Sequence, residues 1–119
     1  MEVNCYKYIN LEYLEMMSDG DDSMKKVMLE MLLEELPLEI KKMDSLCQEG
    51  SWDEVSSVSH KLKSTLAFVG NEEMTNANTN IEGLSKEANN VGQVPKLIET
   101  LQSLCPSTIS ELNLELEKL

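Results

Sequence analysis

Apolar residues recur at helical spacing along most of the chain and predict a protein that is almost wholly helical. The first run, residues 10–20, places Leu11, Leu14 and Met17 near one face of a short helix. Asn10 can cap the start of this helix, and Gly20 suits the position just after its end.

The second run follows Asp21, Asp22 or Ser23, whose side chains can accept hydrogen bonds from the free N–H groups of a first helical turn. Gly50 ends the run. Pro37 lies inside it, and because proline lacks an N–H and crowds the preceding turn, we expect one kinked helix rather than two. The apolar stripe of this helix comprises Met24, Val27, Met28, Met31, Leu32, Leu36, Ile40, Met43 and Cys47.

The rest of the chain predicts three more helices, over about residues 51–70, 71–91 and 94–117. Ser51 and Glu54 have the spacing of a capping box at the start of the first, which Gly70 ends. Asn71 starts the next helix, and Pro106 predicts a kink or a short break in the last. The three stripes are Val55, Val58, Leu62, Leu66 and Val69, then Met74, Ala77, Ile81, Leu84 and Ala88, then Val94, Leu97, Leu101, Leu104, Ile109, Leu112 and Leu116.

The order of these segments predicts an all-α fold of one domain, residues 1–119. Short turns make neighbouring helices antiparallel, so we expect an up-down antiparallel four-helix bundle with a short additional N-terminal helix. No sustained alternation of polar and apolar residues predicts a strand.

The charge balance narrows the range of partners. The chain has 22 acidic residues, ten lysines and no arginine, for a net charge of −12, which disfavours nucleic acid and anionic membrane surfaces as partners. No apolar run approaches the ~20 residues that span a bilayer, and the N-terminus does not have the pattern of a signal peptide. Cys5, Cys47 and Cys105 are too far apart for a C-x-x-C pair, which is typical of free thiols in a reducing compartment. We therefore expect a cytoplasmic monomer that meets other proteins.

The only histidine, His60, falls on the helix predicted over residues 51–70, beside Lys61 and Lys63. On a helical wheel the apolar stripe lies within about 40° of Leu62, whereas His60 falls at about 160° from it. We therefore expect the imidazole to face solvent, where another protein can reach it. Its neighbours on the helix surface are Ser56, Ser57, Lys63, Ser64 and Ala67.

This placement alone leaves two interpretations of His60. A neutral imidazole is a nucleophile near neutral pH, and a phosphoryl group on its ring would find Lys63 placed to pair with it and Lys61 adding a weaker field. A histidine flanked by lysines is also common on an ordinary solvated helix face. A single histidine with no partner ligand one turn away makes a metal site or a hydrolase triad a poor interpretation.

The stretch HKLKSTLAFVG, residues 60–70, resembles the signature of histidine-containing phosphotransfer (HPt) domains. In this resemblance His60 takes the phosphorylated position, Leu62 the buried one and Lys63 the phosphate-pairing one. Thr65 stands for a serine of the signature, and Gly70 is the closing glycine. The order of helices over nearly the whole chain is also similar to that of the family.

Ser64 departs from the family pattern, which has glycine one turn after the histidine. In the family, the missing side chain lets the phosphorylated aspartate of a receiver domain approach. Because serine is small and polar, we expect function to survive with an altered transfer rate or choice of partner.

The resemblance implies a phosphorelay intermediate. His60 would accept a phosphoryl group from a receiver-domain aspartyl phosphate and pass it to another receiver aspartate. The implied partners are response-regulator receiver domains and a hybrid histidine kinase. Mg²⁺ would belong to the receiver, and we expect this chain to bind no cofactor and to have no kinase or nucleotide-binding activity. The receiver-docking face around His60 would comprise Lys61, Ser57, Ser64, Thr65 and Ala67.

Two alternatives remain open. A non-catalytic helical adaptor would dock receivers or other signalling proteins without being phosphorylated, and it would need neither His60 nor Lys63. The methionines Met24, Met28 and Met31 would form a groove for a partner helix, although methionines at helical spacing are more often part of the core. Residues of that helix nearest His60 are also expected to add apolar contacts, ringed by acidic groups, to the docking face.

Overall fold

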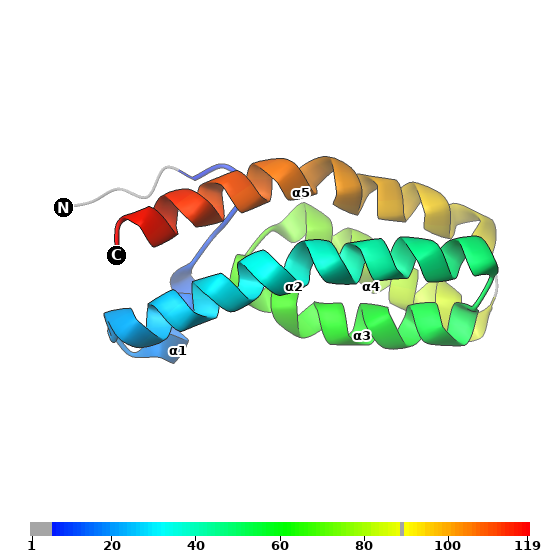
Figure 1. Ribbon diagram of the computed structural model, residues 1–119. Helices are drawn as coiled ribbons and strands as arrows, with labels where there is room; N and C mark the ends of the chain where they lie inside the picture. Colours follow the sequence, from blue (N-terminus) through cyan, green and yellow to red (C-terminus); the bar gives the residue numbers. More distant parts are fainter. Residues whose placement is uncertain (1–5, 89) are drawn as a thin grey trace.

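The computed structural model describes residues 6–88 and 90–119, so Cys5 lies outside the described part of the chain. These residues form five α-helices and one 3₁₀ turn, and none of them lies in a β-strand (Figure 1). The predicted all-α class is therefore confirmed. The elements are α1 (Glu12–Ser18), α2 (Asp22–Glu49), α3 (Trp52–Val69), α4 (Glu72–Glu87), η1 (Val91–Gln93) and α5 (Val94–Glu117).

The four long helices surround one elongated core. α2 packs against α3 and α5, and α4 packs against the same two helices, while α1 lies against α2 and α3 at one end (Figure 1). The facing stripes are aliphatic side chains and methionines, as their helical spacing predicts. The largest fully buried side chains are Leu11, Leu14, Leu29, Leu36, Met43, Leu62, Leu66, Met74, Ile81, Ile98, Leu101 and Leu112.

Three of the predicted helix boundaries can be compared with hydrogen bonds. Asp21 caps α2, since its Oδ1 accepts from the backbone N of Ser23 at 2.9 Å, and Asn71 caps α4 by accepting from Met74 at 3.0 Å. The predicted capping box at Ser51 is wrong, because the Ser51 side chain makes no capping bond. The N–H of Glu54 donates instead to the backbone oxygen of Ser51, at 3.1 Å.

Both internal prolines are accommodated without a break. α2 continues through Pro37 as the single helix that the sequence predicts. α5 also continues through Pro106, so the alternative of a short break there is wrong. The two prolines line the same hollow between α2 and α5, where each helix lacks one N–H donor.

The segment before α1 ties separate helices together. The backbone N–H groups of Lys7 and Tyr8 donate to the Glu111 carboxylate on α5, at 3.0 and 2.7 Å. The Tyr8 carbonyl accepts from Asn71 at 3.0 Å, in the turn between α3 and α4. Residues 6–10 therefore connect α5 to the C-terminal end of α3.

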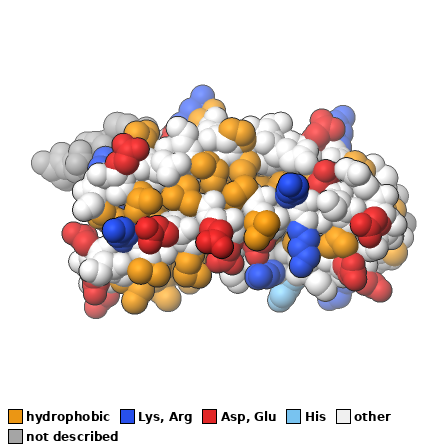
Figure 2. Space-filling model, viewed as in Figure 1, with side chains coloured by type: hydrophobic (Ala, Val, Ile, Leu, Met, Phe, Trp, Pro, Cys, Tyr) orange, Lys and Arg blue, Asp and Glu red, His pale blue; other side chains and the backbone are white. Residues whose placement is uncertain are grey.

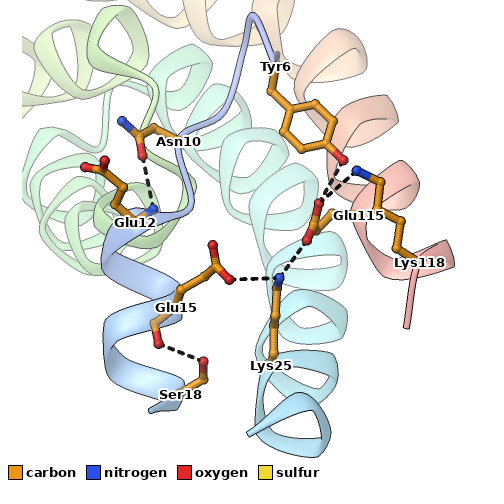
Figure 3. A network of polar contacts seen from close by, with 8 residues as sticks. All are labelled: Tyr6, Asn10, Glu12, Glu15, Ser18, Lys25, Glu115 and Lys118. Carbon is orange, nitrogen blue, oxygen red and sulfur yellow. Dashed lines mark hydrogen bonds and ion pairs between the residues drawn. The ribbon is translucent and has the colours of Figure 1, made fainter. Parts of the chain in front are cut away.

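A buried ion pair joins α2 to α5 at the same end of the molecule. Lys25 lies between Glu115, at 2.6 Å, and Glu15 of α1, at 3.3 Å, and Tyr6 donates to Glu115 at 2.8 Å (Figure 3). Burial raises the pKa of Glu115, but the hydrogen bonds from Lys25 and Tyr6 outweigh it, and the net pKa is lowered. Burial alone would lower the pKa of Lys25, yet its pairing with Glu115 raises it.

Lys25→Met should destabilise the protein by about 3 kcal/mol at neutral pH, because it leaves the Glu115 charge buried without its closest partner. The pKa of Glu115 is lower in the folded protein than in the unfolded chain. The stabilisation that the ion pair gives is therefore complete at pH values above the usual pKa range of glutamate, and it is lost as the pH falls through the pKa of Glu115 in the folded protein. Urea unfolding followed by Trp52 fluorescence at several pH values measures both effects.

The matched control is Lys26→Met, at an exposed position on the same helix, which should change the free energy of unfolding by less than about 0.5 kcal/mol. A loss from Lys25→Met that is the same at pH 3 and pH 7 would contradict the charge argument.

Candidate functional site

His60 lies near the middle of α3, and 74% of its side-chain surface is exposed. The sequence-based prediction that the imidazole points away from the core is therefore confirmed. Figure 2 shows the histidine at the edge of the molecule, with lysine side chains beside it. Another protein can reach the ring from solvent.

A buried polar pair that includes Ser59, the residue before His60, joins α3 to α4. The hydroxyl of Ser59 donates to Asn78 Oδ1 at 2.7 Å, and Asn78 Nδ2 donates back to the Ser59 carbonyl at 2.9 Å. Both side chains are almost wholly buried, so each bond is shielded from competing water. These hydrogen bonds fix how far α3 and α4 are shifted along each other, at the residue next to His60.

Glu82, one turn after Asn78 on α4, lies opposite His60. Its Oε2 is 2.9 Å from His60 Nδ1, and its Oε1 is 3.5 Å from Lys63 Nζ. The hydrogen bond with His60 lowers the pKa of Glu82, burial opposes the effect, and the Lys63 charge adds to it. Glu82 is therefore ionised at neutral pH and can only accept, so His60 Nδ1 is the donor in this contact, and in a neutral ring the lone pair is then on Nε2.

Sequence reasoning missed Glu82. It lies 22 residues beyond His60 and looks like any other acidic residue on a solvated helix face. One signal in the sequence could have helped: the polar residues Ser59 and Asn78 lie next to the apolar stripes of their helices. Buried polar residues of this kind form a specific contact between α3 and α4.

Lys61 and Thr65, on the opposite flank of α3, contact a buried acid of α2. Glu39 is only 5% exposed, and its Oε1 accepts from the Thr65 hydroxyl at 3.0 Å. Lys61 Nζ lies 3.6 Å from Oε2, which accepts no hydrogen bond. Burial raises the pKa of Glu39 and the neighbouring Glu35 raises it further, while Thr65 and Lys61 act in the other direction.

An open groove of about 520 Å³ runs between α2 and α3 and ends at His60. Its surface is mainly apolar, with Lys61 and Glu35 as the charged groups. Figure 2 shows hydrophobic side chains exposed in the region of α1, which packs against both of these helices. We call it the α2–α3 groove; its lining residues are Met28, Met31, Leu32, Glu35, His60, Lys61, Ser64, Thr65 and Phe68.

The residues predicted for the docking face divide into two sets. Lys61, Ser64 and Thr65 line the groove, although Thr65 is only 8% exposed because its hydroxyl turns towards Glu39. Ser57 and Ala67 are exposed on α3 but do not line the groove. The Ser57 hydroxyl donates to the carbonyl of Asp53 on its own helix.

The expectation that methionines at helical spacing belong to the core is wrong for Met24 and Met31, which are 49% and 52% exposed. Met28 is partly buried between them. α2 packs against α3 and α5 along its length and against α1 at one end, and in the described part of the chain these contacts leave Met24 and Met31 about half exposed.

Comparison with known families identifies the family of the chain. The model of the Hpt domain family matches residues 27–119, from the first turns of α2 to the C-terminus. No curated protein and no solved structure shows significant similarity to the chain. Hpt domains are phosphocarrier modules, not kinases, and serve in histidine phosphotransfer within phosphorelays. The resemblance seen in the sequence is thus confirmed, and the chain belongs to the Hpt domain family.

Proposed function

We propose that this chain is a phosphorelay intermediate in which His60 accepts a phosphoryl group from the aspartyl phosphate of one receiver domain and passes it to the aspartate of another. The observation that carries the proposal is the exposed imidazole whose Nδ1 lies 2.9 Å from the ionised Glu82. Residues 1–119 would act as one domain, an up-down antiparallel four-helix bundle with a short N-terminal helix. The pairing of α2 and α4 with both α3 and α5 supports this arrangement.

The proposed step uses the free lone pair of His60 Nε2. This nitrogen attacks phosphorus, the N–P bond forms as the bond from phosphorus to the aspartyl oxygen breaks, and the carboxylate leaves with the bonding electrons. Nδ1 keeps its proton, and the positive charge that develops on the ring lies beside Glu82. Onward transfer reverses these changes with a second receiver aspartate as the acceptor.

Lys63 is the residue that we propose for phosphate pairing. The distance from Lys63 Nζ to Glu82 Oε1 is 3.5 Å, which is longer than a strong charge-assisted hydrogen bond. The Lys63 side chain is also exposed and flexible. A phosphoryl group on Nε2 would attract it away from Glu82. Mg²⁺, which neutralises phosphoryl oxygens during transfer, would come with the receiver.

The receiver domain would dock on the α2–α3 groove. A partner that reaches Nε2 must cover this groove, because His60 forms one end of its lining. Met31, Leu32 and Phe68 offer apolar area, with Lys61 and Glu35 as charged neighbours. Ser64 also lines the groove, so the position at which the family has glycine would lie within this interface and would influence which receivers fit.

The direct test is incubation with a receiver domain loaded by acetyl phosphate, followed by a search for acid-labile label on this chain. Wild type should become labelled, and His60→Gln should not, because the amide has no nucleophilic ring nitrogen. Label that never appears, or that appears equally on His60→Gln, would exclude the proposal. Equal receiver binding by both proteins without label would instead support the non-catalytic adaptor.

Lys63→Ala should shorten the lifetime of the phosphohistidine or slow its formation by about tenfold, the value of one charge-assisted hydrogen bond. Lys61→Ala removes the same charge from the same helix, but Lys61 pairs with Glu39 on the other flank, so its effect on the lifetime of the phosphohistidine should stay below about twofold. Decay of isolated labelled protein gives the lifetimes, and equal effects of the two variants would exclude a special role for Lys63.

Glu82→Ala should let the ring of His60 sample both tautomers and slow phosphotransfer by about tenfold, since it removes the acceptor of the Nδ1 proton. Glu82→Gln keeps an acceptor oxygen without the charge, so it should keep the tautomer and lose less activity. Long-range ¹H–¹⁵N spectra of the imidazole report the tautomer directly. Identical spectra for wild type and Glu82→Ala would refute the positioning role of Glu82.

A further inference from the structure

The methionines of the described part of the chain fall into two classes. Met43 and Met74 have no exposed surface, whereas most methionine side chains of α1 and of the first half of α2 are open to solvent. An exposed thioether is accessible to a peroxide, and a buried one is protected by the packing around it. The exposed members are Met16, Met17, Met24 and Met31, with Met28 partly buried among them.

Two of these methionines, Met28 and Met31, share the α2–α3 groove with His60. We propose that Met31, together with Met28, is an oxidation site through which peroxide switches off receiver docking without harming the phosphoacceptor itself. The inference rests on the proposed function, because it needs a partner that covers the groove when it reaches His60.

The reaction is a two-electron oxidation of sulfur by a peroxide. The thioether attacks one oxygen of hydrogen peroxide, the S–O bond forms as the O–O bond breaks, and the departing hydroxide takes up the proton to give water. The product, methionine sulfoxide, is polar and chiral where the thioether was apolar and adaptable. A thiol-dependent methionine sulfoxide reductase returns it to methionine with release of water.

The position of Met31 decides what the sulfoxide does. The groove that Met31 lines is mainly apolar, with Leu32 and Phe68 among its members, so a docked partner would bury the new oxygen largely against groups that cannot donate to it. An unpaired buried acceptor weakens binding by about tenfold or more. Met16 and Met17 are equally exposed to oxidant but do not line the groove, so their oxidation should leave docking intact.

The thiols of Cys47 and Cys105 are poorer targets. Cys47 is buried and Cys105 is half-buried, and burial raises the pKa of both, which keeps them in the less reactive protonated form at neutral pH. Dithiothreitol alone reverses disulfides and sulfenic acids but not methionine sulfoxide, so it separates cysteine chemistry, including that of Cys5, from methionine chemistry.

The experiment compares wild type, Met28→Leu/Met31→Leu and the matched control Met16→Leu/Met17→Leu, each untreated and treated with hydrogen peroxide. Leucine keeps the apolar volume and cannot form a sulfoxide. Peptide mass spectrometry locates the sulfoxides, and transfer from an acetyl-phosphate-loaded receiver is timed over a range of receiver concentrations. Phosphoramidate, a small donor that needs no docking, measures the reactivity of His60 separately.

After treatment, wild type and the Met16/Met17 variant should each transfer about tenfold more slowly at low receiver concentration, with labelling by phosphoramidate unchanged. The Met28/Met31 variant, whatever its untreated rate, should keep that rate within about twofold after treatment. Dithiothreitol with methionine sulfoxide reductases for both epimers should restore wild type, and dithiothreitol alone should not.

Equal losses in wild type and the Met28/Met31 variant would overturn the inference, as would an undiminished rate in wild type whose Met31 is shown to be sulfoxide. Either result leaves the proposed function intact, because untreated protein still transfers. Untreated wild type that takes no label from any receiver would overturn the proposed function, and this inference with it.

Discussion

The contact between α3 and α4 through Ser59 and Asn78 is the interaction on which the site depends. The reciprocal hydrogen bonds, at 2.7 and 2.9 Å, admit only one register of the two helices, since any slip would leave buried polar atoms without partners. With this register His60 meets Glu82, and Glu82 meets Lys63. The orientation of the imidazole is therefore decided by a buried amide and a hydroxyl that never touch it.

The two lysines beside His60 are held by glutamates from different helices. Lys63 is paired with Glu82 of α4, and Lys61 with Glu39 of α2, so α3 carries one ion pair on each flank. Each lysine charge beside the imidazole is thus partly balanced by a carboxylate of a neighbouring helix. A chain with a net charge of −12 thus places two exposed lysines beside its only histidine, each paired with a glutamate of a neighbouring helix.

Local pattern was sufficient to predict the helices, their order and the outward face of His60, because these follow from the spacing of apolar residues and from capping chemistry. The capping box at Ser51 failed because a backbone carbonyl satisfied the same N–H group. Glu82 and Glu39 could not be predicted, since a contact between helices depends on register and on the angle between them, which one sequence does not specify. The exposed methionines were misjudged for a related reason: the stripe on α2 is wider than its neighbours can cover.

Gly70 shows how the signature is tied to the rest of the chain. It ends α3 with a φ of +75°, and a Cβ at this position would collide with the backbone oxygen of Asn10. Asn10 in turn donates its N–H to the Val69 carbonyl at 2.9 Å, so the segment before α1 contacts the end of the helix that carries His60. The last residue of the motif is therefore constrained by the first residues of the fold. If the HKLKSTLAFVG stretch were exchanged between related proteins, the segment around Asn10, fifty residues before His60, would also have to match it.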